Sequence, residues 1–120
     1  MLPAAERLKA NALFAQVFQA GRSIPESLIV LHLQVLPDSP HVRETGFSVS
    51  KRVGNAVVRN RTKRRLRAAM AELLAELPRG FRAVVVARGR AATADYPALV
   101  AALRRAYGRA GLLKGPATST

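Results

Sequence analysis

Hydrophobic and polar residues recur along the chain at two spacings, one helical and one extended. Residues 11–20 have apolar side chains at helical spacing, which predicts a short helix. Its apolar face holds four residues: Leu13, Phe14, Val17 and Phe18. Asn11 is the predicted N-cap, because its side chain can accept a hydrogen bond from a free backbone N–H. Gly21 is the predicted end of this helix.

Three stretches rich in apolar and β-branched residues predict strands. Residues 27–36 are almost entirely apolar, so this strand is expected to be covered on both faces. Residues 45–51 alternate between apolar and polar side chains, and residues 81–87 are strongly apolar. Residues 37–41 have the composition of a turn, and residues 22–25 are a candidate for a further strand.

The longest predicted element is a helix from about Ala56 to Leu77, which begins after the N-cap residue Asn55 and ends before Pro78. Its apolar side chains form a stripe about 120° wide, which is enough to pack on a sheet. The stripe consists of Val58, Thr62, Leu66, Ala69, Met70, Leu73 and Leu77.

A last helix is predicted to begin at Asp95, with Pro97 in its first turn, and to end near Gly108 or Gly111. The order helix, strand, strand, helix, strand, helix is typical of an α+β sandwich, with helices packed on a small sheet. We expect one domain over residues 1–114 and a disordered tail over residues 115–120.

The net charge narrows the class of partner. The chain has 20 Lys and Arg residues against 7 Asp and Glu residues, a formal net charge of +13. So many positive charges repel one another and destabilise the folded chain, so a polyanionic partner is expected. Nucleic acid is the first candidate for this partner, and an anionic membrane surface is the second. The chain contains no cysteine, which excludes disulfides and thiolate metal sites. It has neither an apolar stretch of about 20 residues nor a secretory signal, which predicts a soluble, cytoplasmic protein.

The positive charge is concentrated between Lys51 and Met70, where eight of twenty residues are Lys or Arg and none is acidic. Opposite the apolar stripe of the central helix lie Asn60, Lys63, Arg64 and Arg67, with Arg59, Arg61 and Arg65 on the flanks. Like charges at i,i+4 and cations near a helix N-terminus are unfavourable, so an outside anion must compensate them. Phosphate suits this role because a guanidinium group binds its oxygens in a bidentate way. Asn60 adds a donor and an acceptor for a ribose hydroxyl or a base edge.

A catalytic site within the chain is not indicated. The seven acidic residues are scattered, and His32 and His41 are the only histidines, so no metal triad or nucleophile–base set is evident. Glu72 and Glu76 lie four residues apart on one helical face, where we interpret them as balancing the arginine run. The chemistry is therefore expected from a partner.

The basic segment also matches a known family. FSVSKRVGNAVVRNRTKRRLR, residues 47–67, closely resembles the signature of the bacterial ribonuclease P protein subunit, and Arg59-Asn60-Arg61 is similar to its "RNR" element. RLKANALFAQVFQAGRS, residues 7–23, resembles the amino-terminal helix of the family. VVVARGRA, residues 84–91, resembles its late strand and the loop that follows.

The resemblance implies a two-layer α/β sandwich of about four strands and three helices, related to a ribosomal-protein domain. It also implies a left-handed βαβ crossover through the central helix, against the usual right-handed rule. The implied partner is a catalytic RNA that removes the 5′ leader from precursor tRNA, supplies the active site and holds most of the Mg²⁺. The protein would bind this RNA and the leader, with no metal site of its own and no obligate protein partner.

Carried over by position, the resemblance implies two sets of site residues. The RNA-binding set consists of Lys51, Arg52, Asn55, Arg59, Asn60, Arg61, Lys63, Arg64, Arg65 and Arg67. The leader set, in a cleft between the first helix and the sheet, consists of Phe14, Phe18, His32, Ser48, Ser50 and Arg88.

Alternatives remain open for both residues and function. Two phenylalanines spaced as Phe14 and Phe18 are more typical of core packing than of base stacking. One of the two can also pack in the core while the other stacks on a base. His32 lies where relatives often carry an aromatic residue, and a lone His on an apolar strand is more typical of a core position. The rival function is a non-enzymatic module for RNA or DNA, but a strand before the basic helix disfavours a helix-turn-helix. A membrane-surface helix is disfavoured because the apolar stripe contains no Trp or Phe.

Overall fold

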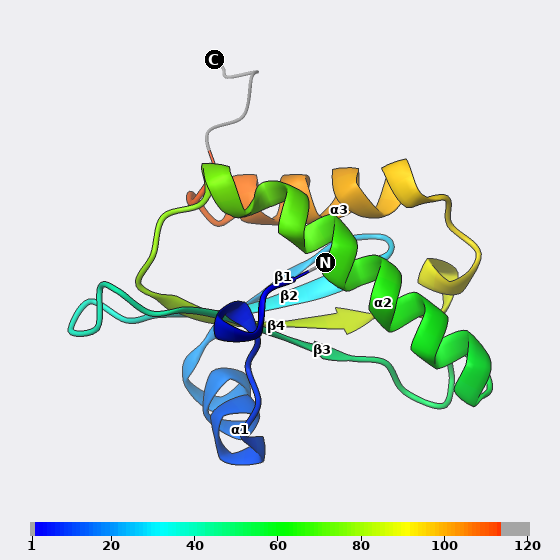
Figure 1. Ribbon diagram of the computed structural model, residues 1–120, viewed down its shortest axis with the longest axis horizontal. Coiled ribbons are helices and arrows are strands. Elements are labelled where there is room, and N and C mark those ends of the chain that lie inside the picture. The colour runs from blue at the N-terminus through cyan, green and yellow to red at the C-terminus, as the bar shows by residue number, and fades with distance from the viewer. Residues whose placement is uncertain (1, 114–120) are drawn as a thin grey trace.

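The computed structural model describes residues 2–113 of the chain. These residues form three α-helices, four strands and three short 3-10 turns, labelled η (Figure 1). In chain order the elements are η1 (Ala4–Glu6), α1 (Asn11–Ala20), β1 (Arg22–Pro25), β2 (Ile29–Val35), β3 (Arg43–Ser48), α2 (Ala56–Leu73), η2 (Leu74–Glu76), β4 (Phe81–Ala87), η3 (Gly89–Ala92) and α3 (Tyr96–Arg109). The predicted α+β class is confirmed, and the candidate strand at residues 22–25 is present. The predicted tail at residues 115–120 lies outside the described residues.

The four strands form one mixed sheet in the order β1-β2-β4-β3. The β1–β2 and β2–β4 pairs are antiparallel, whereas β3 and β4 run parallel. Since parallel neighbours need a crossover connection, the chain passes through α2 between β3 and β4. The left-handed sense expected for this crossover stays a prediction.

The two faces of the sheet are covered to different extents. Helices α2 and α3 pack on one face, and α1 packs on the other (Figure 1). The larger core lies under α2 and α3 and contains fully buried residues such as Leu31, Leu66 and Leu103. The smaller core lies under α1, where Val17 of the helix packs with Val84 of β4. One face is thus a closed core, while the face under α1 is covered over a shorter length.

The prediction that the strand within residues 27–36, which is β2, is covered on both faces is wrong. In β2, buried residues such as Leu31 alternate with half-buried ones such as Val30 and His32. The ten residues of α1 span too little length to cover the whole of this sheet face. The apolar run therefore contributes one face to the large core and leaves the other half-open.

The ends of the helices test the predicted caps. The side chains of Asn55 and Asp95 accept hydrogen bonds from the backbone N–H groups of Val58 and Ala98, at 3.0 and 2.9 Å, which confirms the predicted N-cap Asn55 and the predicted start of the last helix at Asp95. The prediction for Asn11 is wrong, because α1 begins one residue earlier than that cap requires. Its N-cap is Ala10, which makes no side-chain cap bond, and Asn11 is the first helical residue.

Two further boundaries differ from the sequence pattern. Strand β3 begins two residues before the predicted segment 45–51, because Arg43 and Glu44 pair with the start of β4. It ends at Ser48, after which the chain turns into α2.

Helix α1 ends at Ala20 as predicted, and the next residue must be a glycine. A Cβ at Gly21 would lie 2.7 Å from the carbonyl oxygen of Leu33, which is too close.

Candidate nucleic-acid interface

Helix α2 is fixed by its apolar stripe, as predicted, but it ends at Leu73, so the predicted end at Leu77 is wrong: η2 follows, and Leu77 lies after it. Leu66, Ala69, Met70 and Leu73 are fully buried against the sheet and α3. Thr62 is also fully buried, and its hydroxyl donates a hydrogen bond to the carbonyl of Val58 at 2.8 Å, so this polar atom is satisfied. A helix held from Thr62 to Leu73 in this way presents its opposite face in a defined orientation.

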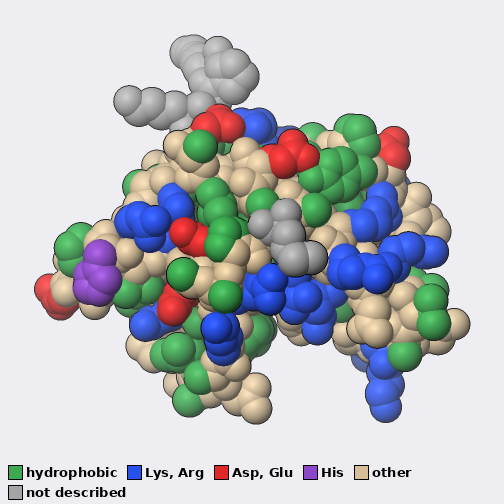
Figure 2. Space-filling view, viewed as in Figure 1, with side chains coloured by type: hydrophobic (Ala, Val, Ile, Leu, Met, Phe, Trp, Pro, Cys, Tyr) green, Lys and Arg blue, Asp and Glu red, His purple; other side chains and the backbone are tan. Residues whose placement is uncertain are grey.

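The opposite face of α2 is cationic and open to solvent. Asn60, Arg61 and Arg64 are exposed, and Lys63 and Arg67 are half-buried. Figure 2 shows Lys and Arg side chains gathered over the N-terminal half of this helix. The helical-wheel prediction of a cationic face opposite the apolar stripe is therefore confirmed as a structural statement.

The basic residues between positions 51 and 67 take part in none of the ion pairs formed within residues 2–113. Those ion pairs use six other arginines: Arg43, Arg79, Arg82, Arg104, Arg105 and Arg109. The carboxylates that form these ion pairs are Glu6, Glu26, Glu44 and Glu76. The positive charge of the N-terminal half of α2 is therefore not neutralised by an ion pair within residues 2–113.

Two flanking arginines bind the backbone of their own chain. Arg59 donates to the carbonyl of Gly54 at 3.0 Å, which holds the turn before α2. Arg65 donates to the carbonyl of Ala94 at 2.7 Å, which ties α2 to the loop that follows β4. Sequence reasoning assigned both to RNA alone, because Ala94 lies 29 residues from Arg65 and no local pattern links them.

The interpretation of Glu72 and Glu76 as a balance for the arginine run is wrong. Glu76 forms a two-bond ion pair with Arg104 of α3, at 2.8 and 3.2 Å, and Glu72 accepts a hydrogen bond from the hydroxyl of Tyr96. Burial, together with this carboxylate, raises the pKa of Tyr96 to about 12. Glu72 therefore joins α2 to α3, and Glu76 joins η2 to α3.

The two phenylalanines of α1 have different environments. The ring of Phe14 lies on Gly46 of β3, where an added Cβ would come within 2.3 Å of the ring, so glycine makes room for this packing. Phe18 is 45% exposed, and its ring meets that of His32 edge-on, with the centroids 4.8 Å apart. Phe14 is thus a packing residue, and Phe18 is the one whose ring is open to a partner.

His32 lies on the half-open sheet face rather than in the core. Its row across the sheet runs through Val84 to Gly46, and the next row runs from Val30 through Val86 to Ser48. The expectation of a core histidine is therefore wrong. Partial burial lowers the pKa of His32 below its ordinary value of 6.5, which favours the neutral imidazole at neutral pH.

Three residues of the predicted leader set lie close to the start of α2, which carries the predicted RNA-binding set. Strands β3 and β4 are parallel, so Ser48, Ser50 and Arg88 all lie near their carboxyl ends, where the chain also enters α2. Figure 2 shows the outline of the molecule indented between α1 and the N-terminal part of α2. Arg90, an exposed residue of η3 two positions after Arg88, belongs to neither predicted set.

Two further observations bound what this site can do. Within residues 2–113, His, Asp and Glu side chains nowhere gather in threes as metal ligands would. In the same residues, every helix is too short or too polar to cross a bilayer. The site is therefore built from cations, amides, hydroxyls and aromatic rings, which suits binding of a polyanion with stackable bases.

Fold and site together define a class: a small basic α+β protein with a preformed surface for nucleic acid. The family model described as Ribonuclease P matches residues 2–111, and the chain belongs to this family. The ribonuclease P protein component of Gluconacetobacter diazotrophicus is 42% identical over 113 residues, which cover 93% of this chain and 97% of that protein. That of Bacillus mycoides is 40% identical over 106 residues, covering 88% and 91%.

Solved structures of the same family share the fold. The RNase P protein of Staphylococcus aureus superposes with a TM-score of 0.79 at 28% identity, covering 91% of this chain and 98% of that one. The RNase P protein of Thermotoga maritima superposes with a TM-score of 0.75 at 25% identity, covering 87% and 96%. The family resemblance drawn from residues 47–67 is thereby confirmed.

Proposed function

We propose that this chain acts as the protein subunit of ribonuclease P in the cytoplasm. In this proposal α2 binds the RNA subunit, and the sheet face beside α1 contacts the 5′ leader of precursor tRNA. The observation that carries the proposal is the cationic face of α2, which is held rigid by a buried stripe and is free of ion pairs within residues 2–113.

A rigid cationic face favours binding to folded RNA for two reasons. Neutralising phosphates releases condensed counterions, which gives affinity at low salt. Since the helical backbone that carries the arginines is already ordered, only their side-chain freedom is lost when RNA binds, and not that of the backbone. Asn60, exposed between Arg59 and Arg61, adds hydrogen bonds that a guanidinium group cannot make, because it has both a donor and an acceptor.

The sheet face beside α1 suits a single strand. An exposed aromatic ring that stacks on a base contributes about 1–3 kcal/mol, and Phe18 offers such a ring. The neutral His32 imidazole and the Ser48 hydroxyl lie on the same sheet face and can bind a base or ribose. Arg88, at the end of β4, is placed for a phosphate of the same strand.

We assign the cleavage chemistry and the Mg²⁺ to the RNA subunit. The described residues do not fit a metal site, since they bring together no cluster of three carboxylates or imidazoles. Hence no step of phosphodiester hydrolysis is assigned to a side chain of this protein. Its part is to bind, to orient and to neutralise charge.

Reconstitution tests the proposal. The purified protein is added to a bacterial ribonuclease P RNA at low Mg²⁺ with precursor tRNA as substrate. The expected result is restored 5′ cleavage, with none by the protein alone. If cleavage is not restored while unrelated RNAs bind equally well, the chain is instead a general RNA-binding module.

A pair of matched variants tests the α2 face. Arg61→Gln with Arg64→Gln removes two exposed, unpaired cations, and Arg105→Gln with Arg109→Gln removes two that pair with Glu26. Both doubles change the net charge equally. We expect the first to flatten the slope of log K against log salt by about one to two units and the second to leave it nearly unchanged. Equal slopes in both doubles would remove this face from the interface.

A further inference from the structure

The segment before α1 passes from one face of the sheet to the other. Leu2 is fully buried in the core under α2 and α3, whereas Leu8 is buried in the core under α1. Between them, Arg7 pairs with Thr45 on the outer edge of β3, and the N–H of Leu8 donates to the Thr45 carbonyl at 3.0 Å. We call residues 2–8 the N-terminal strap; it runs beside β3 and leads into α1 (Figure 1).

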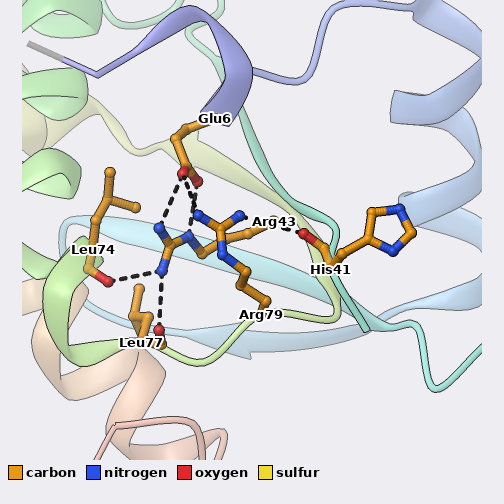
Figure 3. Close-up of polar contacts among 6 residues, drawn as sticks. All are labelled: Glu6, His41, Arg43, Leu74, Leu77 and Arg79. Carbon is orange, nitrogen blue, oxygen red and sulfur yellow. Dashed lines mark hydrogen bonds and ion pairs between the residues drawn. The ribbon is translucent and has the colours of Figure 1, made fainter. Parts of the chain in front are cut away.

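The strap is joined to the far end of α2 by one guanidinium group. Arg43, the first residue of β3, donates through Nε and Nη2 to the two carboxylate oxygens of Glu6, at 2.8 and 2.9 Å. Its Nη1 donates to the carbonyls of Leu74 and Leu77, at 2.8 and 3.0 Å, in the turn that ends α2 (Figure 3). Leu74 begins η2 and Leu77 directly follows it, so both carbonyls lie where the chain leaves α2; the Leu74 carbonyl also accepts the N–H of Leu77 at 3.2 Å.

The Glu6–Arg43 pair is well shielded from water. The side chains of Glu6 and Arg43 are only 9% and 11% exposed. Arg79 closes the pair from outside with a longer contact to Glu6, at 3.4 Å, and a hydrogen bond to the carbonyl of His41 (Figure 3). The planar guanidinium group of Arg43 has donors in fixed directions that match both carboxylate oxygens and both carbonyls. The ammonium group of a lysine could make only some of these hydrogen bonds.

We propose that Glu6 and Arg43 are positioning residues that hold α1 and α2, on opposite faces of the sheet, in one fixed relation. The inference rests on the proposed function, because the sheet face beside α1 and the cationic face of α2 must then engage one RNA assembly together. If the Glu6–Arg43 pair is broken, the sheet face beside α1 and the cationic face of α2 each keep their own packing. Their position relative to each other becomes less fixed. Breaking the pair is therefore expected to reduce the affinity gained when both surfaces bind one RNA assembly, and not the affinity of either surface by itself.

The test compares substrates with and without a leader. Holoenzyme is reconstituted from each protein variant and ribonuclease P RNA, and its dissociation constants for precursor tRNA and for mature tRNA are measured. Their ratio is the leader gain. Glu6→Gln and the milder Arg43→Lys are the test variants. The control, Glu44→Gln, breaks the 2.8 Å pair with Arg82, which joins β3 to β4 without involving the strap or α2.

We expect both test variants to bind the RNA subunit within about twofold of the wild type and to lose at least about threefold in leader gain. The control should retain both quantities. All variants are assayed at a temperature where circular dichroism shows them folded, and Arg43→Lys serves where Glu6→Gln does not fold. A wild-type leader gain in either folded test variant would overturn the proposal. So would a parallel loss of RNA-subunit affinity and leader gain.

Amide exchange in the free protein keeps the inference separate from the proposed function. The N–H of Leu8 bonds to Thr45 and that of Leu77 bonds to the Leu74 carbonyl, so these amides report on the strap and on the end of α2. Both should exchange faster in the test variants and stay unchanged in Glu44→Gln. Faster exchange at Leu8 alone would refute the link to α2, whatever the RNA experiments give. A wild-type holoenzyme without any leader gain would instead count against the proposed function.

Discussion

Asn55 and Asn60 carry the same side chain but stand in different environments. Asn55 precedes α2, and its carboxamide oxygen accepts the N–H of Val58, one of the donors that the start of a helix leaves unpaired. Asn60 lies in the second turn, exposed on the cationic face. The first residue therefore stabilises the helix, and the second is open to solvent.

Alanine substitution should separate these two roles. Asn55→Ala is expected to lower the free energy of unfolding by about 1 kcal/mol, because the N-cap bond is lost. Asn60→Ala should change it by less than about 0.5 kcal/mol, since the site is exposed and alanine favours helix. Urea denaturation measures both, and RNA binding at fixed salt should be weakened mainly by Asn60→Ala. Equal loss of stability in both variants would contradict these assignments.

At the scale of elements, α2 organises its surroundings through its polar residues as well as its apolar stripe. Arg65 fixes the loop after β4 through the Ala94 carbonyl, and this loop carries the exposed Arg88 and Arg90. A residue on the flank of the cationic helix thus positions further cations beside it. Arg64, one position earlier, is exposed and belongs to the open face.

Neutral replacements of these neighbours should give different results. Arg65→Gln removes a hydrogen bond worth about 0.5–1.5 kcal/mol, so amides of the loop such as Ala91 and Ala94 should exchange roughly two- to tenfold faster. Arg64→Gln should leave this exchange unchanged while weakening RNA binding. Hydrogen exchange followed by mass spectrometry or NMR measures the effect. Unaltered exchange in Arg65→Gln would mean that the loop is held by its own turns.

At the scale of the whole molecule, the formal net charge of +13 destabilises the folded protein by self-repulsion. A bound polyanion such as RNA reduces this repulsion. The ion pairs of the described residues serve α3, the strap and the sheet, and they leave the field around α2 uncompensated. Salt screens such exposed charges over roughly 10 Å at 0.1 M. It should therefore act in opposite directions on the free protein and on its complex with RNA.

We expect the melting temperature of the free protein to rise by a few degrees, about 2–5 °C, between low salt and about 0.5 M KCl, as self-repulsion is screened. RNA binding should weaken over the same range. Arg61→Gln with Arg64→Gln should melt higher than the wild type at low salt and gain less from added KCl. Thermal unfolding at several salt concentrations measures this. A melting temperature that falls with salt would show that favourable ion pairs outweigh the repulsion.

Local patterns in the sequence determined a large part of this protein. The stripe from Thr62 to Leu73 and the cations opposite it follow from helical spacing, and the cap at Asn55 follows from a side chain that bonds within three residues. The strand at residues 81–87 follows from an apolar run between turns. Each of these depends on neighbours in the chain, so no knowledge of the tertiary fold was needed.

Only the tertiary structure decided which distant groups meet. Glu6 and Arg43 are 37 residues apart, Arg65 and Ala94 are 29 apart, and Glu76 reaches Arg104 across 28. It also decided that Phe18 stays exposed while Phe14 packs on Gly46, and that α1 leaves part of the sheet face open. A helical or strand period specifies the side of an element on which a residue lies, but it does not specify the partner that packs there.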